Sequence, residues 1–319
     1  MKSSRFLCVM FMMLSACSFV GAAQTTDDLL KEINANVKEN TKAVQELNKL
    51  IKSGKFAIGG AGAGALAAGE IDQDAVKSMS TADKDALIKS LNWQTNDKIT
   101  AFGDPRAKKG GTLTCVESSF PPTLRTTGKN ANTSFNSTLS GLCYETLLDL
   151  DPISYDYAPN LAKRWAVADD KQTFFFEIDE RAKWSDGKPV CANDVVQTWK
   201  LYVDDDLEDP FSVDFYSKYE CPVAVSDRII MVKSKQLNWR AFMSFGCSTP
   251  ILPGHVLEKI SGKQYLTDYQ FKMMPGSGPY TYESSKVNEE VIMARRTDWW
   301  QKDLPKNVGY YNFDKLHFV

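Results

Sequence analysis

The sequence has very little histidine and almost no net charge, and each shortage excludes a class of protein. Only His255 and His317 occur in 319 residues, and they are far apart in the chain. A His-rich metal site is therefore not expected, and we predict no metal and no cofactor. The 38 Lys and Arg residues nearly balance the 40 Asp and Glu residues, for a net charge of −2. No basic surface is expected for a nucleic acid partner.

The cysteines lack the spacings that mark redox and zinc sites. Five follow the N-terminal region, namely Cys115, Cys143, Cys191, Cys221 and Cys247, and no two form a C-x-x-C motif. An odd number leaves at least one unpaired. Cys221 and Cys247 are one candidate disulfide that spacing alone cannot establish, and several of the five are expected to be small buried hydrophobes.

The N-terminus has the pattern of a secretory signal. Lys2 and Arg5 precede an apolar run over residues 6–14, and small residues follow. The run is too short to cross a bilayer core of about 30 Å as a helix. We therefore expect export to the periplasm.

Two cleavage sites compete within residues 1–23. Leu14-Ser-Ala-Cys17 resembles the bacterial lipobox, which would make Cys17 an acylated anchor to a membrane. The small residues 21–23 suit ordinary signal peptidase instead. The lipobox is favoured because it lies directly at the end of the apolar run.

A helical stalk is predicted over residues 24–58. Apolar residues and one Asn recur at alternating steps of three and four, at Leu30, Ile33, Val37, Asn40, Val44, Leu47 and Ile51. This is the seam of a left-handed coiled coil, so a homo-oligomer through residues 27–53 is one interpretation. The other is a single amphipathic helix docked on a neighbour.

A break and a second helical region follow. Residues 59–69 are rich in Gly and Ala, and we interpret them as a flexible linker. Gly62–Ala67 also fits the dinucleotide pattern G-x-G-x-x-A, but no clear strand precedes it. Residues 70–107 are predicted to be a helical spacer, with a helix starting near Thr81 and capped by Ser80 or Thr81.

Residues 108–319 mix strand and helix signals and predict an α/β body. Strands are expected over 110–116, 173–178 and 229–232, with a tight turn at Asp186-Gly187. A helix is expected over 195–202, capped by Asn193 or Asp194, and another from Pro253.

Several motifs in this body resemble family 5 of the bacterial extracellular solute-binding proteins. They run in one order, with Lys109-Gly-Gly-Thr-Leu113, Pro159-Asn-Leu-Ala-Lys-Arg-Trp165, Asp170 through Phe176, Ala182-Lys-Trp-Ser-Asp-Gly-Lys-Pro-Val190 with Ala192-Asn-Asp-Val195, Gly276-Ser-Gly-Pro-Tyr280, and Asp298-Trp-Trp-Gln-Lys-Asp-Leu-Pro305 with Tyr311-Asn-Phe-Asp314. The match covers about residues 108–319. The last pair resembles the branch that takes up larger oligopeptides.

The resemblance implies a fold and a function. The fold is a type II periplasmic binding protein with mixed-sheet lobes, and the function is the substrate-binding component of an ABC importer, with permease subunits as partners and no catalysis. Members are longer than this chain, so we expect a fragment that lacks the C-terminal lobe and does not bind peptide with native affinity alone. The alternative is a structural lipoprotein whose coiled coil is the working part and whose binding domain is degenerate.

Most of the motifs also have a structural interpretation, which we favour. Trp165 and Trp184 are expected to be core anchors, and Gly276 and Gly278 to let a strand turn sharply. Ser185 with Lys188 fits the S-x-x-K pattern of penicillin-binding enzymes, but Asp-Gly between them prevents the helix that this chemistry needs.

The resemblance places ligand contacts in the loop after the first strand. Glu117, Ser118, Ser119 and Phe120 are predicted there, and Tyr144 is added from an expected helix over residues 139–147. Glu117 would meet a ligand amine, and Phe120 would cover an apolar face. The alternative is that Glu117 is merely solvated and Phe120 belongs to the core.

Overall fold

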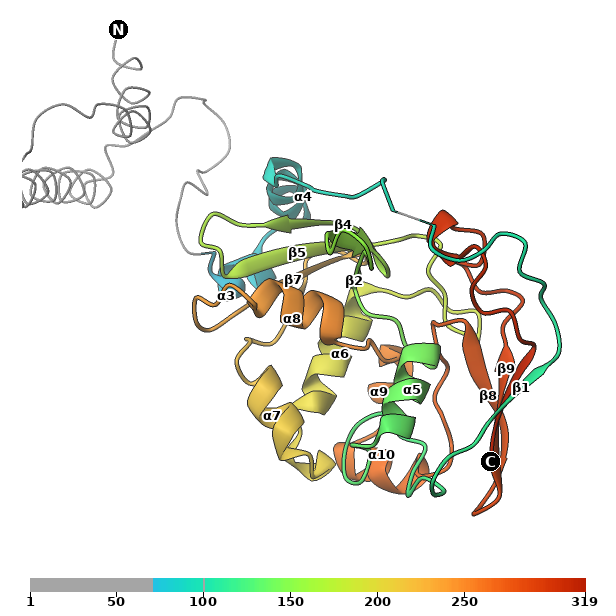
Figure 1. Ribbon diagram of the computed structural model, residues 1–319. Coiled ribbons are helices and arrows are strands. Elements are labelled where there is room, and N and C mark those ends of the chain that lie inside the picture. The colour runs from blue at the N-terminus through green and yellow to red at the C-terminus, as the bar shows by residue number, and fades with distance from the viewer. Residues whose placement is uncertain (1–70, 100) are drawn as a thin grey trace, which may run out of the picture. The chain divides into compact units, whose positions relative to one another are not determined.

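Two four-stranded sheets form the body of the protein in the computed structural model, which describes residues 71–99 and 101–319 (Figure 1). The predicted signal segment 1–23 with Cys17, the coiled-coil-like helix 24–58 and the linker 59–69 lie outside the described residues. The described residues fall within one unit of the chain, residues 64–319.

The first sheet is antiparallel and has the order β4-β5-β7-β6. Its strands are β4 (Ala162–Val167), β5 (Thr173–Ile178), β7 (Ile229–Lys233) and β6 (Val223–Ala224). A separate two-stranded sheet pairs β2 (Leu148–Leu150) with β3 (Tyr157–Pro159).

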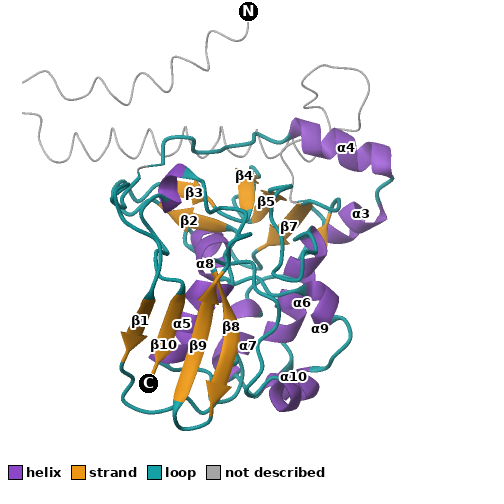
Figure 2. Ribbon diagram, turned by 90° about the vertical axis from the view of Figure 1, so that its right-hand side faces the viewer, coloured by secondary structure: helices purple, strands orange, loops and turns teal. Residues whose placement is uncertain are grey.

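The second sheet has the order β1-β10-β9-β8, and Figure 2 shows its strands side by side. Here β1 (Thr112–Cys115) runs parallel to β10 (Lys315–Phe318), while β9 (Glu290–Arg295) pairs antiparallel with β10 and with β8 (Tyr280–Lys286). Thr112 pairs with Lys315, so a strand near the start of the body lies beside one near its end. The predicted strands over 110–116, 173–178 and 229–232 are confirmed.

Helices cover and connect the sheets. They are α3 (Gln73–Ser78), α4 (Thr81–Ser90), α5 (Ser134–Cys143), α6 (Ala192–Tyr202), α7 (Pro210–Tyr216), α8 (Ala241–Ser248), α9 (Gly254–Leu257) and α10 (Gly262–Asp268), with 3-10 turns at Asp205–Leu207 and Pro305–Asn307. Among these, α5 contacts β8, and α6 contacts β7 and α9. None of the helices in the described part of the chain combines the length and apolar character needed to cross a membrane.

The aromatic run of β5 explains why its sheet is covered on both faces. Phe174 and Phe176 belong to the main core, whereas Phe175 points into a second cluster with Met231 on the other face. All three are at most 1% exposed. Alternation along a strand sends successive side chains to opposite faces, so three consecutive Phe residues require a cover on each side.

Residues 71–99 supply the cover of the second face. Val76 of α3 and Leu87 of α4 are buried in the cluster around Phe175. Gln94 then exchanges two backbone hydrogen bonds with Trp165, of 2.7 and 2.9 Å, at the outer edge of β4. The predicted start of α4 is confirmed, with Ser80 as N-cap. The spacer prediction for residues 70–107 did not anticipate that this segment packs on the sheet.

The predicted cap of the helix after the Trp184 hairpin is wrong. The helix begins at Ala192 with Cys191 as N-cap, so Asp194 is its third residue. The Asp194 carboxylate accepts hydrogen bonds from the backbone N–H of Cys191 (2.7 Å), that of Gly254 (2.7 Å) and Trp184 Nε1 (3.2 Å). Burial raises the pKa of Asp194. Asp194 therefore completes a capping box with Cys191 from the third position of the helix, and it also joins the hairpin, α6 and α9.

The Trp184 hairpin and the Gly276–Tyr280 turn meet directly. The N–H of Ser185 donates to Gly276 O at 2.8 Å, and the N–H of Gly276 donates to Ser185 Oγ at 3.2 Å. Arg296 adds a hydrogen bond from Nη1 to Gly276 O at 3.0 Å. Trp184 is fully buried and Trp165 nearly so. The expectation that Trp165 and Trp184 are core anchors is confirmed.

The reason for Gly276 and Gly278 differs from the predicted one. Neither has the positive φ that favours glycine. A Cβ atom at Gly276 would lie 2.4 Å from Cys143 O, and one at Gly278 would lie 2.5 Å from Leu142 O. The turn thus needs glycine because its backbone approaches the end of α5 closely.

The five described cysteines are all free, so the candidate pair Cys221 and Cys247 is not a disulfide. Cys143 is buried, and burial raises the pKa of its thiol. Within residues 71–99 and 101–319, no group of three or more His, Cys, Asp or Glu side chains is placed to hold a metal ion.

Candidate functional site

A cavity of about 200 Å³ lies at the carboxyl ends of the parallel strands β1 and β10. Its walls come from four parts of the chain, namely the loop after β1, α5, the β8–β9 hairpin and the end of β10. The lining residues are Glu117, Ser119, Phe120, Pro121, Phe135, Asn288, Glu289, Val291, Phe318 and Val319. Open α/β sheets commonly bind ligands outside the carboxyl ends of their strands, so we name this the β1–β10 cavity.

Backbone pairing fixes the loop that forms one wall of the β1–β10 cavity. The Val319 N–H donates to Cys115 O at 3.0 Å, and the Glu117 N–H donates to Val319 O at 2.7 Å. The parallel ladder therefore continues for one step beyond the two strands. This pairing holds Glu117 at the rim, although the neighbouring Val116 is 84% exposed.

The floor of the cavity is apolar and well packed. Phe135 of α5 and Phe318 of β10 meet edge to face, with ring centroids 5.1 Å apart. Both are at most 5% exposed, and Val291 of β9 is 1% exposed. Phe120 lies half-buried at the side and contacts Phe271, with ring centroids 6.0 Å apart. Such a floor is suited to an apolar side chain of a ligand.

The rim of the cavity is polar and acidic. Glu117 and Glu289 face it from opposite walls, and Ser119 adds a hydroxyl. Glu289 has an exposed and long ion pair with Lys286, at 3.8 Å, which solvent screens. Among the described residues Glu117 has no ion pair, so its carboxylate is available to a cationic group.

The predicted ligand residues divide into two groups. Glu117, Ser119 and Phe120 line the β1–β10 cavity, whereas Ser118 is exposed outside its lining. Tyr144 is buried, and its hydroxyl donates to Met274 O at 3.0 Å. The expected helix over 139–147 is wrong in extent, because α5 ends at Cys143 and Tyr144 is its C-cap. That these five residues contact a ligand stays a prediction.

The sequence reasoning missed the wall formed by the β8–β9 hairpin. Asn288, Glu289 and Val291 reach the cavity because β9 pairs with β10, and β10 pairs with β1. The short polar stretch 286–290 between two strands was the available signal for a hairpin. Its position beside residue 117 depends on a pairing that no local pattern specifies.

A second, more polar cavity of about 250 Å³ surrounds Glu145, directly after Tyr144. The Glu145 carboxylate accepts hydrogen bonds from Trp299 Nε1 (3.1 Å), Trp300 Nε1 (3.1 Å) and Gln301 Nε2 (2.6 Å). Burial raises the pKa of Glu145 to about 7, although the two Trp donors and the nearby Lys306 act in the opposite direction.

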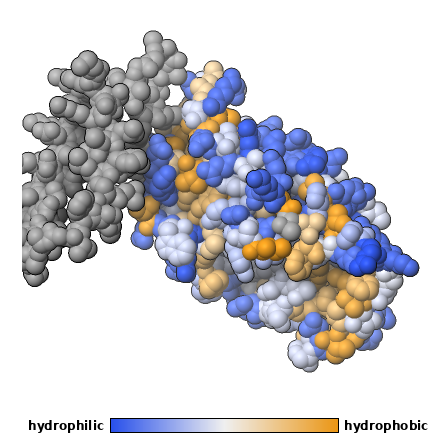
Figure 3. Space-filling model, turned by 45° about the horizontal axis from the view of Figure 1, so that its top comes forward, coloured by the Kyte–Doolittle hydropathy of each residue, from blue (hydrophilic) through white to orange (hydrophobic). Residues whose placement is uncertain are grey.

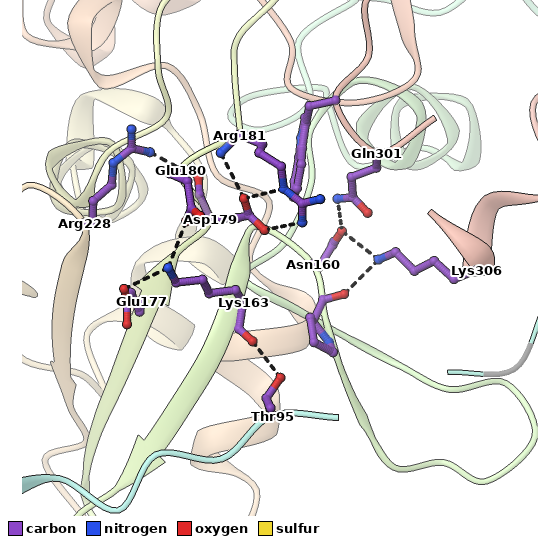
Figure 4. A network of polar contacts seen from close by, with 12 residues as sticks. Thr95, Asn160, Lys163, Glu177, Asp179, Glu180, Arg181, Arg228, Gln301 and Lys306 are labelled. Atoms are coloured by element: carbon purple, nitrogen blue, oxygen red, sulfur yellow. Dashed lines mark hydrogen bonds and ion pairs between the residues drawn. The ribbon is translucent and has the colours of Figure 1, made fainter. Parts of the chain in front are cut away.

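Figure 4 shows how this second cavity is tied to the loop before β4. Asn160 Oδ1 accepts from Gln301 Nε2 at 2.7 Å and from Lys306 Nζ at 3.2 Å. Lys306 also donates to Pro159 O at 2.9 Å, and burial lowers the pKa of its ammonium group. These bonds join the segment between β9 and β10 to the loop between β3 and β4. We therefore interpret the cluster as a link between the two sheets.

The neighbouring charges in Figure 4 are paired. Lys163 lies 3.1 Å from Glu177 and 2.8 Å from Glu180, and Arg181 lies 2.7 Å from Asp179. The hydroxyl of Thr95 donates to Lys163 O at 2.8 Å and fastens residues 71–99 to the same strand. Lys163 and Arg181 are thus paired with carboxylates, and Arg228 donates to the backbone carbonyls of Asp179 and Val190. Glu117, at the rim of the β1–β10 cavity, has no ion pair among the described residues.

Comparison with known proteins agrees with the motifs. The family model described as bacterial extracellular solute-binding proteins, family 5 Middle, matches residues 156–319, just over half of the chain. The chain belongs to this family. Members of family 5 bind solutes outside the cytoplasm, and the family is not an enzyme family.

Curated relatives resemble most of this chain, but the chain spans only about a third of their length. The peptidoglycan-binding protein YepA of Agrobacterium fabrum is 31% identical over 227 residues, covering 67% of this chain and 35% of YepA. The probable peptide-binding protein YejA of the same organism is 28% identical over 223 residues, covering 68% and 35%.

Solved structures share the fold of most of this chain. The oligopeptide-binding protein AppA of Bacillus subtilis, in complex with a nonapeptide, superposes with a TM-score of 0.58 at 19% identity. The match covers 67% of this chain and 40% of AppA. A periplasmic oligopeptide-binding protein of Thermotoga maritima gives a TM-score of 0.54 at 22% identity, covering 66% and 37%. The mixed α/β fold predicted from the sequence is confirmed at this level.

Proposed function

We propose that this chain is the substrate-binding component of an ABC importer and that its β1–β10 cavity forms one wall of a site for peptide-like solutes. The observation that carries the proposal is a cavity with an apolar floor and an acidic rim at the carboxyl ends of β1 and β10. An importer component of this kind works with permease subunits in the inner membrane, which we propose as its partners.

The chemistry of the cavity matches that of a peptide. The Glu117 carboxylate is suited to a terminal ammonium group or a basic side chain, and the Ser119 hydroxyl donates or accepts a hydrogen bond. The floor at Phe135 and Phe318 suits an apolar side chain. Within the described residues β1 is an edge strand, so an extended peptide has backbone groups with which to pair.

The relatives suggest two kinds of peptide-like ligand. One is an ordinary oligopeptide, as the names of AppA and of the Agrobacterium YejA indicate. The other is a peptide derived from peptidoglycan, as the name of YepA indicates. Both have a backbone and charged groups that the rim and floor can accommodate.

We also propose that the protein is held at a membrane in the periplasm through an acyl group on Cys17. The support is the lipobox-like Leu14-Ser-Ala-Cys17 at the end of the apolar run. Labelling cells with a radioactive fatty acid tests this, since wild-type protein should incorporate the label and the Cys17→Ser variant should not. Equal labelling of both would contradict the anchor.

Fluorescence anisotropy with labelled peptides tests the binding site. We expect weak binding, because a cavity of about 200 Å³ covers only a few groups of a peptide. Two probes should be compared, a lysine-containing oligopeptide and a peptidoglycan stem peptide. The Glu117→Gln variant should bind the better probe about threefold to tenfold more weakly, because it loses one charge interaction at the rim.

The control for this experiment is Glu283→Gln. Glu283 lies on β8 and is ion-paired with Lys315 at 2.6 Å, outside the cavity lining. Its loss changes the net charge by the same amount and should leave peptide binding unchanged. If both substitutions weakened peptide binding equally, the effect would come from net charge alone, and Glu117 would not belong to the site.

A further inference from the structure

The loop between β7 and α8 carries the largest exposed aromatic side chain of the described chain. Trp239 is 79% exposed, and Leu237, two residues earlier, is 71% exposed. All six residues 235–240 are exposed. We call this segment, Lys235–Arg240, the Trp239 loop.

Isolated exposed apolar residues are ordinary, and Figure 3 shows hydrophobic residues scattered among hydrophilic ones over one face. The Trp239 loop differs because its apolar residues lie between two cations. Lys235 begins the loop, and Arg240 ends it with its guanidinium 4.6 Å from the centre of the Trp239 ring. Neither cation has an ion pair with another described residue. Tryptophan and leucine flanked by basic residues are typical of the membrane interface.

The backbone of the loop is also held in place by hydrogen bonds. The Lys235 N–H donates to Lys218 O at 2.8 Å, and the Ser234 hydroxyl donates to Gln236 O at 2.7 Å. At the other end, Asn238 Oδ1 accepts from the Arg240 N–H at 2.9 Å. An exposed indole on a fixed backbone loses little conformational entropy when it is buried in another phase.

The loop lies near the first residue of the described chain. Lys233, two residues before the loop, donates from Nζ to the carbonyl of Ile71 at 3.0 Å. Ile71 is the first described residue, so the start of the described chain lies within reach of the residue that precedes the loop. Figure 1 shows α3 and the turn into α8 at the same end of the lobe.

We infer that the Trp239 loop is a membrane-contact site, at which Trp239 and Leu237 enter the interface of an anionic bilayer while Lys235 and Arg240 contact lipid phosphates. This inference rests on the proposed export and anchoring of the chain. Contact of this kind adds a second attachment to a single acyl chain, and stable anchoring generally takes two signals. It would also bring the lobe close to the membrane that contains a permease.

One neighbouring feature opposes the attraction. The Ser234 N–H donates to Gln172 O, so the turn containing Asp169, Asp170 and Lys171 lies next to the loop. This turn has two carboxylates and one ammonium group. Removing the exposed carboxylate of Asp169 should therefore strengthen binding to an anionic surface, which gives the inference a test of opposite sign.

Co-sedimentation with lipid vesicles tests the inference. The full chain carrying Cys17→Ser should be used, so that acylation at Cys17 does not contribute. With vesicles of equal parts phosphatidylglycerol and phosphatidylethanolamine, Trp239→Ala should weaken binding roughly tenfold, the size expected for losing burial of a large side chain. Lys235→Gln and Arg240→Gln should each weaken it about fivefold. Asp169→Asn should strengthen it.

The matched control is Phe211→Ala. Phe211 is 76% exposed, but it lies two residues after Asp209 in the chain and three from both Glu208 and Asp214. Its loss should leave vesicle binding unchanged. Equal binding by the parent, the Trp239 variant and the two cation variants would overturn the inference, as would cross-linking of the loop to a protein partner without lipid binding.

The same variants separate this inference from the proposed function. Trp239 and its neighbours lie outside the β1–β10 cavity, so their substitution should not change peptide binding in the anisotropy assay. Loss of lipid binding with intact peptide binding supports the inference. Peptide binding that fails in the parent chain contradicts the proposed function and leaves the vesicle result to stand on its own.

Discussion

The junction between the Trp184 hairpin and the Gly276–Tyr280 turn contrasts with the loop over residues 117–121. In the first, buried side chains and backbone groups fix each other through several hydrogen bonds, with Trp184 fully buried and bonded to Asp194. In the second, the described contacts are a backbone ladder to Val319 and the packing of the half-buried Phe120 against Phe271 and the core. The residues that identify the family are thus scaffold, whereas those proposed to meet the solute are weakly constrained.

The largest expected effect is the loss of stability when the buried junction at Trp184 is disrupted. Trp184→Ala should lower the free energy of unfolding by about 3–5 kcal/mol, because it opens a large cavity in the core. It also leaves the buried Asp194 carboxylate without one of its donors. Urea denaturation measures the change. As a control, Trp239→Ala should alter it by no more than about 0.5 kcal/mol, since that side chain is 79% exposed.

The buried carboxyl of Glu145 adds a pH dependence. Its pKa is raised to about 7 in the folded chain, against about 4.3 when unfolded. Between these values the folded chain binds more protons than the unfolded chain, so the contribution to stability is present below about pH 4.3 and is lost as pH rises through about 7. The loss amounts to roughly 4 kcal/mol at most.

Glu145→Gln should remove this slope while lowering stability at every pH, because one acceptor for the Trp and Gln donors is lost. Urea unfolding of the parent and of Glu145→Gln at about pH 5 and about pH 8 measures how the free energy of unfolding of each protein changes with pH. The exposed Glu283→Gln serves as control and should keep the slope of the parent. Parallel curves for the parent and Glu145→Gln would show that Glu145 is ionised in the folded chain at both pH values.

A substitution in the Gly276–Tyr280 turn should have a smaller effect on stability. Gly278→Ala should cost about 1–3 kcal/mol, because the new Cβ would lie 2.5 Å from Leu142 O. Gly141→Ala, in the adjacent helix α5, meets nothing within 4 Å and should stabilise the chain by about 0.5–1 kcal/mol. Thermal unfolding of the two variants measures both changes in stability. If both substitutions stabilised or both destabilised the chain, the close approach to Leu142 O would not explain the glycine.

The smallest expected change belongs to the loop. Glu117→Gln and Ser119→Ala should each change the free energy of unfolding by less than about 0.5 kcal/mol, since neither side chain has a hydrogen bond or ion pair with another described residue. Urea denaturation is again the measurement. A loss comparable to that of Gly278→Ala would place these residues with the scaffold and weaken the contrast between the two regions.

The sequence predicted the scaffold well because its signals are local. The aromatic run of β5, the Asp186-Gly187 turn and the Ser80 cap each depend on neighbours in the chain, and the structure confirms all three. Predictions that depended on distant packing were less successful. The N-cap position at Asn193 or Asp194 was wrong, because the helix begins earlier with Cys191 as N-cap. Asp194 completes the capping box from the third position and also bonds Trp184 and Gly254.

The candidate site was predictable only in part for the same reason. The loop after β1 follows a recognisable strand, so Glu117, Ser119 and Phe120 could be chosen from the sequence. The opposite wall at Asn288 and Glu289 comes from a hairpin about 170 residues later. Only the pairing of β1 with β10 and of β10 with β9 brings it there.

Photo-cross-linking tests the central claim most directly, because it captures weak binding at a chosen position. Benzoylphenylalanine should be placed at position 120, inside the β1–β10 cavity, and in a second protein at position 211, on the exposed face of α7. Irradiation with the better peptide probe should label the first protein and leave the second unlabelled, and unlabelled peptide should compete. Equal labelling at both positions, or no competition at position 120, would contradict a solute site at the carboxyl ends of β1 and β10.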